Sequence, residues 1–431
     1  MGLFPCHHMK NTKRQTLIAA VISIALLYQL DGLAQTQASD FETQPILSAA
    51  DLVPASLIHG SHHGLSAPVQ LEGYRAVFEI DSAQGRFRAA GREQLLQRIA
   101  ELPAIENLRR VNKSEAFTDA LAKAAKAPLA FVGNVLSNPG AALGNVASGL
   151  GQMVESAGGV VQSGLERVSD GASDIANATA KAVETDGEQE PPSFISDPFG
   201  YNKARRLWAK TLAVDPYTTN PLLRQLLDDA ASATFAGSFA VDATLGIVAA
   251  PVKFVVGFDA QSQDMVWDLS PADIQIQVES KLKDMGIEGR LVRDFFRNPW
   301  LTPTLQTGLA NALERMGSVT GRGAAIELAS RMQSESRLRS LIEALSLLAD
   351  HHQKSAPLAD LRLSGIMAVA TRKDGELVAA ISADYFFWNA AAAEFAGRAD
   401  LAAPRRTLLL SGKASPRARQ ELTRAGWALA E

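Results

Sequence analysis

The chain has 431 residues, with 42 lysines and arginines against 46 aspartates and glutamates, and a formal net charge of −4 at pH 7. This length allows two or three domains with buried cores, because domains average about 150 residues. Ordinary apolar and charged fractions exclude a disordered chain, and the mildly acidic balance argues against nucleic acid as a partner.

The N-terminal segment has the pattern of a secretory signal peptide. Basic residues precede an apolar run at 17–30, and small residues follow that run. These three features are typical of export across a bacterial inner membrane, whereas the run is short for a membrane span. We therefore expect residues 1–38 to be removed, with Met1 or Met9 as the start and an uncleaved anchor as the alternative. The mature protein is expected to be periplasmic or secreted.

The expected cleavage also decides the thiol chemistry of the mature protein. Cys6 is the only cysteine, and it precedes the apolar run. The segment 1–38 carries Lys10, Lys13 and Arg14 against Asp31, a net of +2, so its removal leaves a charge of −6. The mature chain is therefore expected to contain no disulfide and no thiolate ligand or nucleophile.

Residues 39–130 predict a small unit of hairpin and helix. Apolar and charged residues alternate through 74–81, which is the period of a half-buried strand. A tight turn leads to a returning strand, and a helix is expected to begin near Gly91. Pro103 is expected to end this helix because proline lacks a backbone N–H, with further helix continuing to about Lys126.

Residues 131–192 form a Gly/Ala-rich amphipathic segment that ends in an acidic, proline-terminated linker. Gly140, Gly144, Ser148 and Gly151 are spaced to let two helices approach closely. Each interior glycine weakens a helix by roughly 0.5–1 kcal/mol, so this helix needs a partner. We expect a protein partner or a second copy of this chain. Peripheral membrane contact is the alternative, and it is disfavoured by the scarcity of Lys and Arg.

Residues 193–355 predict a helical domain. The apolar stretch 231–258 is interrupted by charge and proline, which favours a buried core helix over a membrane span. Three helix starts are marked by a capping side chain followed by proline at the first helical position. These starts are Asn220–Pro221, Ser270–Pro271 and Thr302–Pro303.

Residues 356–431 predict a mixed α/β unit with the element order ββαβαβ. An Asp374–Gly375 turn joins the first two strands, at 364–371 and 376–383. The remaining elements are a helix at 389–398, a strand at 406–410, a helix capped by Ser415 and a strand at 427–430. The whole chain is therefore expected to be α+β and mostly helical, with a helical middle domain between two smaller units.

Five histidines remain in the mature chain as candidate metal ligands. His59, His62 and His63 lie in a glycine-flanked loop, and His351 and His352 end a predicted helix. Imidazoles from both groups together would suit zinc or copper. Their spacing matches no strong metal motif, and histidines are common at helix ends, where the helix dipole favours positive charge. We therefore expect no cofactor, with a divalent transition metal such as zinc as the alternative.

Carboxylates are the remaining catalytic candidates, because the chain contains no nucleophile motif. Asp215 opens a polar loop, and Asp228 lies on the helix that follows. Two acids over such a loop would perform acid–base chemistry if burial raised the pKa of one of them. The favoured interpretation is a loop that caps the next helix. The aromatic run at 384–389 is expected to pack in the core.

These patterns favour an exported envelope protein with a binding or structural role, acting through the Gly/Ala-rich segment. The alternative is a periplasmic hydrolase or metal-binding protein that uses the cluster of His59, His62 and His63 or the acids near Asp215. No motif places the chain in a known family, and the substrate, the partner and the oligomeric state are left open by the sequence.

Overall fold

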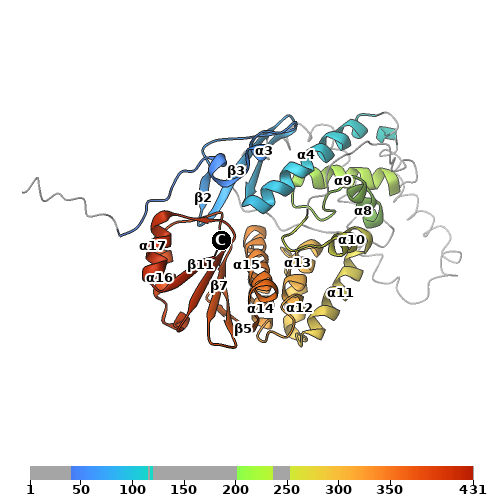
Figure 1. Ribbon diagram of the computed structural model, residues 1–431. Coiled ribbons are helices and arrows are strands. Elements are labelled where there is room, and N and C mark those ends of the chain that lie inside the picture. Colours follow the sequence, from blue (N-terminus) through green and yellow to red (C-terminus); the bar gives the residue numbers. More distant parts are fainter. Residues whose placement is uncertain (1–39, 115–116, 120–200, 236–252, 431) are drawn as a thin grey trace, which may run out of the picture.

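The computed structural model confirms the α+β class. A small antiparallel sheet with a helix comes first, helices follow, and a mixed sheet covered by helices ends the chain (Figure 1). The expected signal peptide, the Gly/Ala-rich segment and the centre of the apolar stretch 231–258 lie outside the described residues. The described residues are 40–114, 117–119, 201–235 and 253–430.

The N-terminal sheet is built around one long strand, β3 (Arg75–Ser82). Strand β4 (Gly85–Ala90) pairs with one edge of β3, as the alternating pattern predicted. The other edge of β3 pairs with β1 (Gly64–Leu65) and β2 (Gln70–Glu72), which the sequence analysis did not predict. Helices α2 (Ala49–Leu52) and α3 (Ala55–Ile58) precede the sheet.

The prediction that Pro103 ends its helix is wrong. Helix α4 runs without interruption from Arg92 to Asn112. Proline removes one hydrogen bond and costs about 3 kcal/mol in a helix interior. Leu102, Ile105 and Leu108, which lie on both sides of Pro103, are fully or almost fully buried. Burial of each leucine-sized side chain contributes about 1.5–3 kcal/mol, which outweighs the cost of the proline.

The middle of the chain is helical, as predicted. Asn220, Ser270 and Thr302 each accept backbone N–H bonds at the helix starts where the sequence placed them. Helices α8 and α9 pack into the core of the N-terminal unit, whereas α10 to α15 share a second core with one face of the C-terminal sheet. The helices are α8 (Tyr201–Thr211), α9 (Pro221–Phe235), α10 (Ala260–Asp268), α11 (Pro271–Asp284), α12 (Arg290–Arg297), α13 (Pro303–Glu314), α14 (Gly323–Arg331) and α15 (Glu335–Lys354). No helix among the described residues combines the length and apolar character needed to cross a membrane.

The C-terminal sheet has the order β11-β9-β7-β6-β5. Helix α15 packs against one face, and α16 and α17 cover the other (Figure 1). The predicted element order is found with additional strands: β5 precedes the predicted hairpin, and β8 and β10 form a short parallel pair. The elements are β5 (Leu358–Ser364), β6 (Met367–Arg372), β7 (Leu377–Ile381), β8 (Tyr385–Phe386), α16 (Ala390–Gly397), β9 (Arg406–Leu410), β10 (Lys413–Ala414), α17 (Pro416–Arg424) and β11 (Trp427–Ala430).

The first described residues are bound to the C-terminal unit. The backbone N–H of Glu42 donates to the carbonyl of Trp388 at 2.7 Å. The Glu42 carboxylate accepts from the Trp388 N–H and the Ser415 hydroxyl, each at 2.6 Å. In the adjacent N-terminal hairpin, the Tyr74 carbonyl accepts from the N–H groups of Asp384 and Tyr385. The N-terminal unit and the C-terminal sheet are therefore joined directly by hydrogen bonds.

Candidate functional site

The structure gives the three loop histidines separate partners. His62 Nδ1 lies 3.1 Å from a Glu106 carboxylate oxygen, and His63 Nε2 lies 3.0 Å from the Leu57 carbonyl. His59 ends α3 and forms an isolated backbone bridge with Gly64. In the parts of the chain that the structure describes, no three His, Cys, Asp or Glu side chains are arranged to hold a metal ion. The candidate metal ligands are thus not brought together in the described part of the chain.

The two remaining histidines lie in the last turn of α15, as the sequence predicted. His352 Nδ1 accepts the backbone N–H of Leu358 at 3.0 Å. Burial lowers the pKa of His351, which favours its neutral form. His352 therefore helps to set the turn from α15 into β5.

Asp215 and Asp228 do not form an acid–base pair. Asp215 is 2% exposed, and its Oδ1 accepts the Tyr217 N–H at 2.8 Å and the Thr304 hydroxyl at 2.7 Å. Asp228 instead pairs with Arg205 at 2.9 Å. Burial raises the pKa of Asp215 to about 6. The shift that the catalytic interpretation required is present, but this carboxyl is enclosed by protein contacts.

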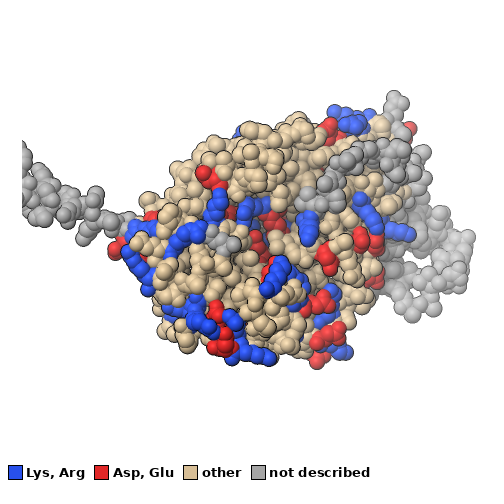
Figure 2. All heavy atoms as spheres, viewed as in Figure 1, with Lys and Arg blue, Asp and Glu red and all other residues tan. Residues whose placement is uncertain are grey.

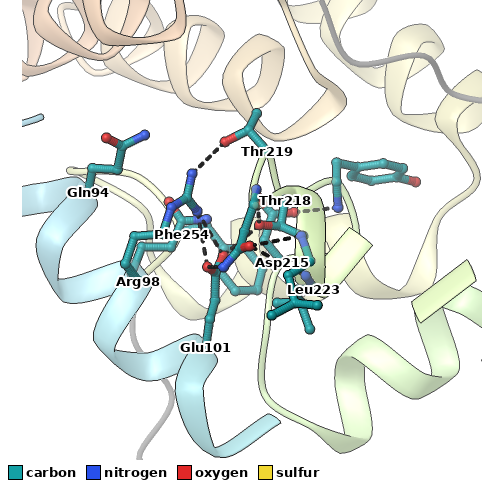
Figure 3. Close-up of polar contacts among 12 residues, drawn as sticks. Gln94, Arg98, Glu101, Asp215, Thr218, Thr219, Leu223 and Phe254 are labelled. Carbon is teal, nitrogen blue, oxygen red and sulfur yellow. Dashed lines mark hydrogen bonds and ion pairs between the residues drawn. The ribbon is translucent and has the colours of Figure 1, made fainter. Parts of the chain in front are cut away.

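The structure reveals a buried polar network that the sequence analysis missed. Helix α4 presents a face of charged and amide side chains to α15 and to the loop at 215–220 (Figure 3). All of these side chains are buried, although residues of this kind are mostly exposed in proteins. The α4 members are Glu93, Gln94, Gln97, Arg98 and Glu101.

Glu101 is the centre of the contacts between α4 and the 215–220 loop. It is 1% exposed, and both of its oxygens lie within 3.1 Å of Arg98 Nη1. The Thr218 hydroxyl and the Asn220 side-chain amide also donate to it, at 2.5 and 2.8 Å. A buried carboxylate with this many donors is well compensated. Thr219 extends the network, since it accepts from Arg98 and donates to Glu335.

Arg339 of α15 is the second centre. Its guanidinium donates to Glu335 and Glu93, both at 2.7 Å, and to Gln97 at 2.8 Å. A fourth bond reaches the Phe254 carbonyl. Burial alone would lower the pKa of Arg339, but the two carboxylates outweigh it and raise that pKa. Arg339 therefore stays charged and links α15 to α4.

Arg75 extends the network to the C-terminal sheet. It donates to Glu343 of α15 at 2.6 Å and to the Ala90 carbonyl at 3.0 Å, and it also bonds to Ser382. Asp384 accepts the backbone N–H of Ala76 at 2.8 Å. One network therefore connects the N-terminal sheet, α4, α15 and the C-terminal sheet.

The network has more buried carboxylates than arginines, and its acids respond differently to burial. Burial raises the pKa of Glu93, whereas Arg339 and Arg98 outweigh burial at Glu335 and lower its pKa. Because every centre is enclosed and contacts protein groups, this arrangement suits a structural connection between units.

The aromatic run at 384–389 packs in the core, as the sequence predicted. Phe386, Phe387 and Trp388 are buried, and Tyr74 lies on Phe386 with ring centroids 4.4 Å apart.

Comparisons with protein-family models, with curated proteins and with solved structures found no match.

We expect mild acidification to stabilise the fold through Asp215. The folded-state pKa of about 6 lies above the ordinary value of 3.8, so the folded state binds more protons between these two pH values. The contribution of Asp215 to the free energy of unfolding is therefore lost as the pH rises from about 4 through 6. Urea unfolding should give a free energy of unfolding about 1 kcal/mol higher at pH 5.5 than at pH 7.5.

The Asp215→Asn variant isolates this effect because the amide oxygen can still accept the bonds from Tyr217 and Thr304. This variant should reduce the pH dependence of the free energy of unfolding and stabilise the protein at pH 7.5. The variant Asp284→Asn, at an exposed position, is the control, and its free energy of unfolding should depend on pH as that of the wild type does. An unchanged slope in Asp215→Asn would contradict the prediction.

Proposed function

We propose that this protein is exported to the bacterial envelope and acts there through binding or as a structural component. The observation that carries the proposal is that the candidate catalytic and metal-binding side chains do not converge on one site. His59, His62 and His63 have separate partners, and Asp215 is enclosed while Asp228 pairs with Arg205. The signal-peptide pattern of residues 1–38 supports the location.

The Gly/Ala-rich segment is the proposed interaction element. Phe117, which precedes it, and α8, which follows it, both belong to the core of the N-terminal unit. The segment 131–192 therefore connects, along the sequence, two parts of one core. A protein partner or a second copy of this chain would cover the small residues Gly140, Gly144, Ser148 and Gly151.

The surface of the described residues fits a water-soluble domain to which the interaction element is attached. Basic and acidic side chains are interspersed over the face drawn in Figure 2. Mixed charge of this kind keeps a protein soluble and discourages non-specific association. On this proposal, specific binding is provided by the inserted segment.

A periplasmic hydrolase remains the alternative proposal. The observation in its favour is Asp215, whose pKa of about 6 suits a general acid or base near neutral pH. The burial of Asp215, which is 2% exposed, counts against it, because a substrate would have to reach a carboxyl group that lies inside the protein.

Fractionation of cells that express the full chain tests the export proposal. We expect a processed protein in the soluble periplasm, with a mass-spectrometric N-terminus near Gln35 or Ser39. A variant that lacks residues 1–38 is the control and should stay in the cytoplasm. An unprocessed full-length chain in the cytoplasm would overturn the proposal. A carbonate-resistant pellet with residues 10–30 intact would mean that the segment is an anchor.

A further inference from the structure

A surface pocket of about 410 Å³ lies between the loop that joins α11 to α12 and the loop that joins α13 to α14. Helices α12 and α14 pack side by side at this place (Figure 1). The volume falls within the range of roughly 300–1,000 Å³ that is common for small-molecule sites. Its apolar lining comes from Met285, Ile287, Leu291 and Val319.

Arg322 gives the pocket a positive charge. Its side chain is half-buried, and its Nη1 donates to the Leu313 carbonyl at 3.3 Å. Among the described residues Arg322 forms no ion pair, and the neutral Leu313 carbonyl does not cancel its charge. Burial lowers the pKa of Arg322, but a guanidinium stays protonated in proteins. The exposed Glu288 also lines the pocket, on the opposite loop.

The loop that carries Arg322 is fixed against β5. Thr320 N–H donates to the Ala359 carbonyl at 3.0 Å, and Leu361 N–H donates to the Thr320 carbonyl at 2.8 Å. A Cβ on Gly321 would lie 2.0 Å from the Leu361 carbonyl oxygen, so only glycine fits there. The wall beside Arg322 is therefore held in place before any ligand arrives, which lowers the entropic cost of binding.

We propose that this pocket binds a small organic acid, with an apolar body against the half-buried Met285 and Leu291 and its carboxylate on Arg322. A planar guanidinium and a carboxylate form bidentate hydrogen bonds of high specificity. The exposed parts of Met285 and Leu291 favour an organic anion over a bare inorganic one, because only an organic anion would remove them from water. This inference is independent of the export proposal.

Titration of the full chain with 3-phenylpropionate and with its neutral amide tests the proposal. We expect the acid to bind with a Kd of about 0.1–1 mM, which is typical of a ligand of this size, and the amide at least about tenfold more weakly. Chemical-shift changes or calorimetry would measure both affinities. Equal affinity for acid and amide, or no binding of the acid at about 10 mM, would overturn the proposal.

Two variants test the two halves of the site. Arg322→Gln should weaken binding of the acid at least about tenfold and leave the amide unchanged. Gly323→Leu should weaken binding of both, because its Cβ would meet Leu291 at 3.6 Å and Ile287 at 3.9 Å and the rest of the side chain would occupy space in the pocket. The exposed Arg293→Gln is the matched control and should bind as the wild type does. Wild-type binding by a folded Gly323→Leu variant would place the ligand elsewhere.

Discussion

Replacement of Arg339 by methionine is expected to lower the free energy of unfolding by about 3–5 kcal/mol. Methionine keeps most of the side-chain length but removes the charge that Glu93 and Glu335 share. Both carboxylates would then be buried without their cation, and Gln97 would lose its donor. Urea unfolding followed by tryptophan fluorescence would measure the loss.

The matched control for this variant lies on the same helix. Arg337 is exposed on α15, so Arg337→Met should change stability by less than about 0.5 kcal/mol. The destabilisation by Arg339→Met should also be smaller at pH 5 than at pH 7.5, since protonation relieves the unpaired carboxylates. Equal effects of the two variants would show that the network does not hold α4 to α15.

The second large effect is expected at Gly91, which precedes α4. Its backbone has φ 89° and ψ 159°, a region open essentially only to glycine. A Cβ there would also lie 1.9 Å from Arg75 Nη2 and 2.3 Å from Arg75 Cζ. Gly91→Ala should therefore cost about 2–4 kcal/mol, because it strains the backbone and displaces Arg75 from Glu343. Calorimetric Tm and urea unfolding would both report the change.

The variant Gly73→Ala tests backbone strain without a clash between the new Cβ and a neighbouring side chain. Gly73 also has a positive φ, 62°, but a Cβ there would meet nothing within 4 Å. This variant should cost only about 1–2 kcal/mol, the strain of the left-handed backbone. If Gly91→Ala cost no more than Gly73→Ala, the close packing of Arg75 against Gly91 would contribute nothing to stability.

The strands that the sequence predicted are those with a strong local signal. Alternation identified β3 and β4, and the Asp374–Gly375 turn identified the β6–β7 hairpin. Strands β1 and β2 escaped prediction because two or three residues carry no measurable period. Their pairing is fixed by the long edge of β3, which is a tertiary effect.

The polar network could not be predicted because burial is not a local property. Leu95, Leu96 and Ile99 recur at helical spacing, but spacing alone does not say which polar side chains of the helix are buried. In the structure Leu96 is 39% exposed, whereas Glu93 and Gln97 are buried against Arg339. Both faces of α4 are covered, one by the sheet and α9, the other by α15 and the 215–220 loop. Only the spacing of Glu93, Gln97 and Glu101 at intervals of four hinted at a shared environment.

The binding of Glu42 to Trp388 and Ser415 has a consequence for the order of folding. These side-chain contacts span 346 and 373 residues of sequence. Contacts between such distant residues form slowly, since a long loop must close first. During synthesis or export from the N-terminus, the segment around Glu42 would emerge long before its binding site exists. The contacts of Glu42 with the C-terminal unit therefore form only after the last strands are made, and until then the chain would depend most on protection from aggregation.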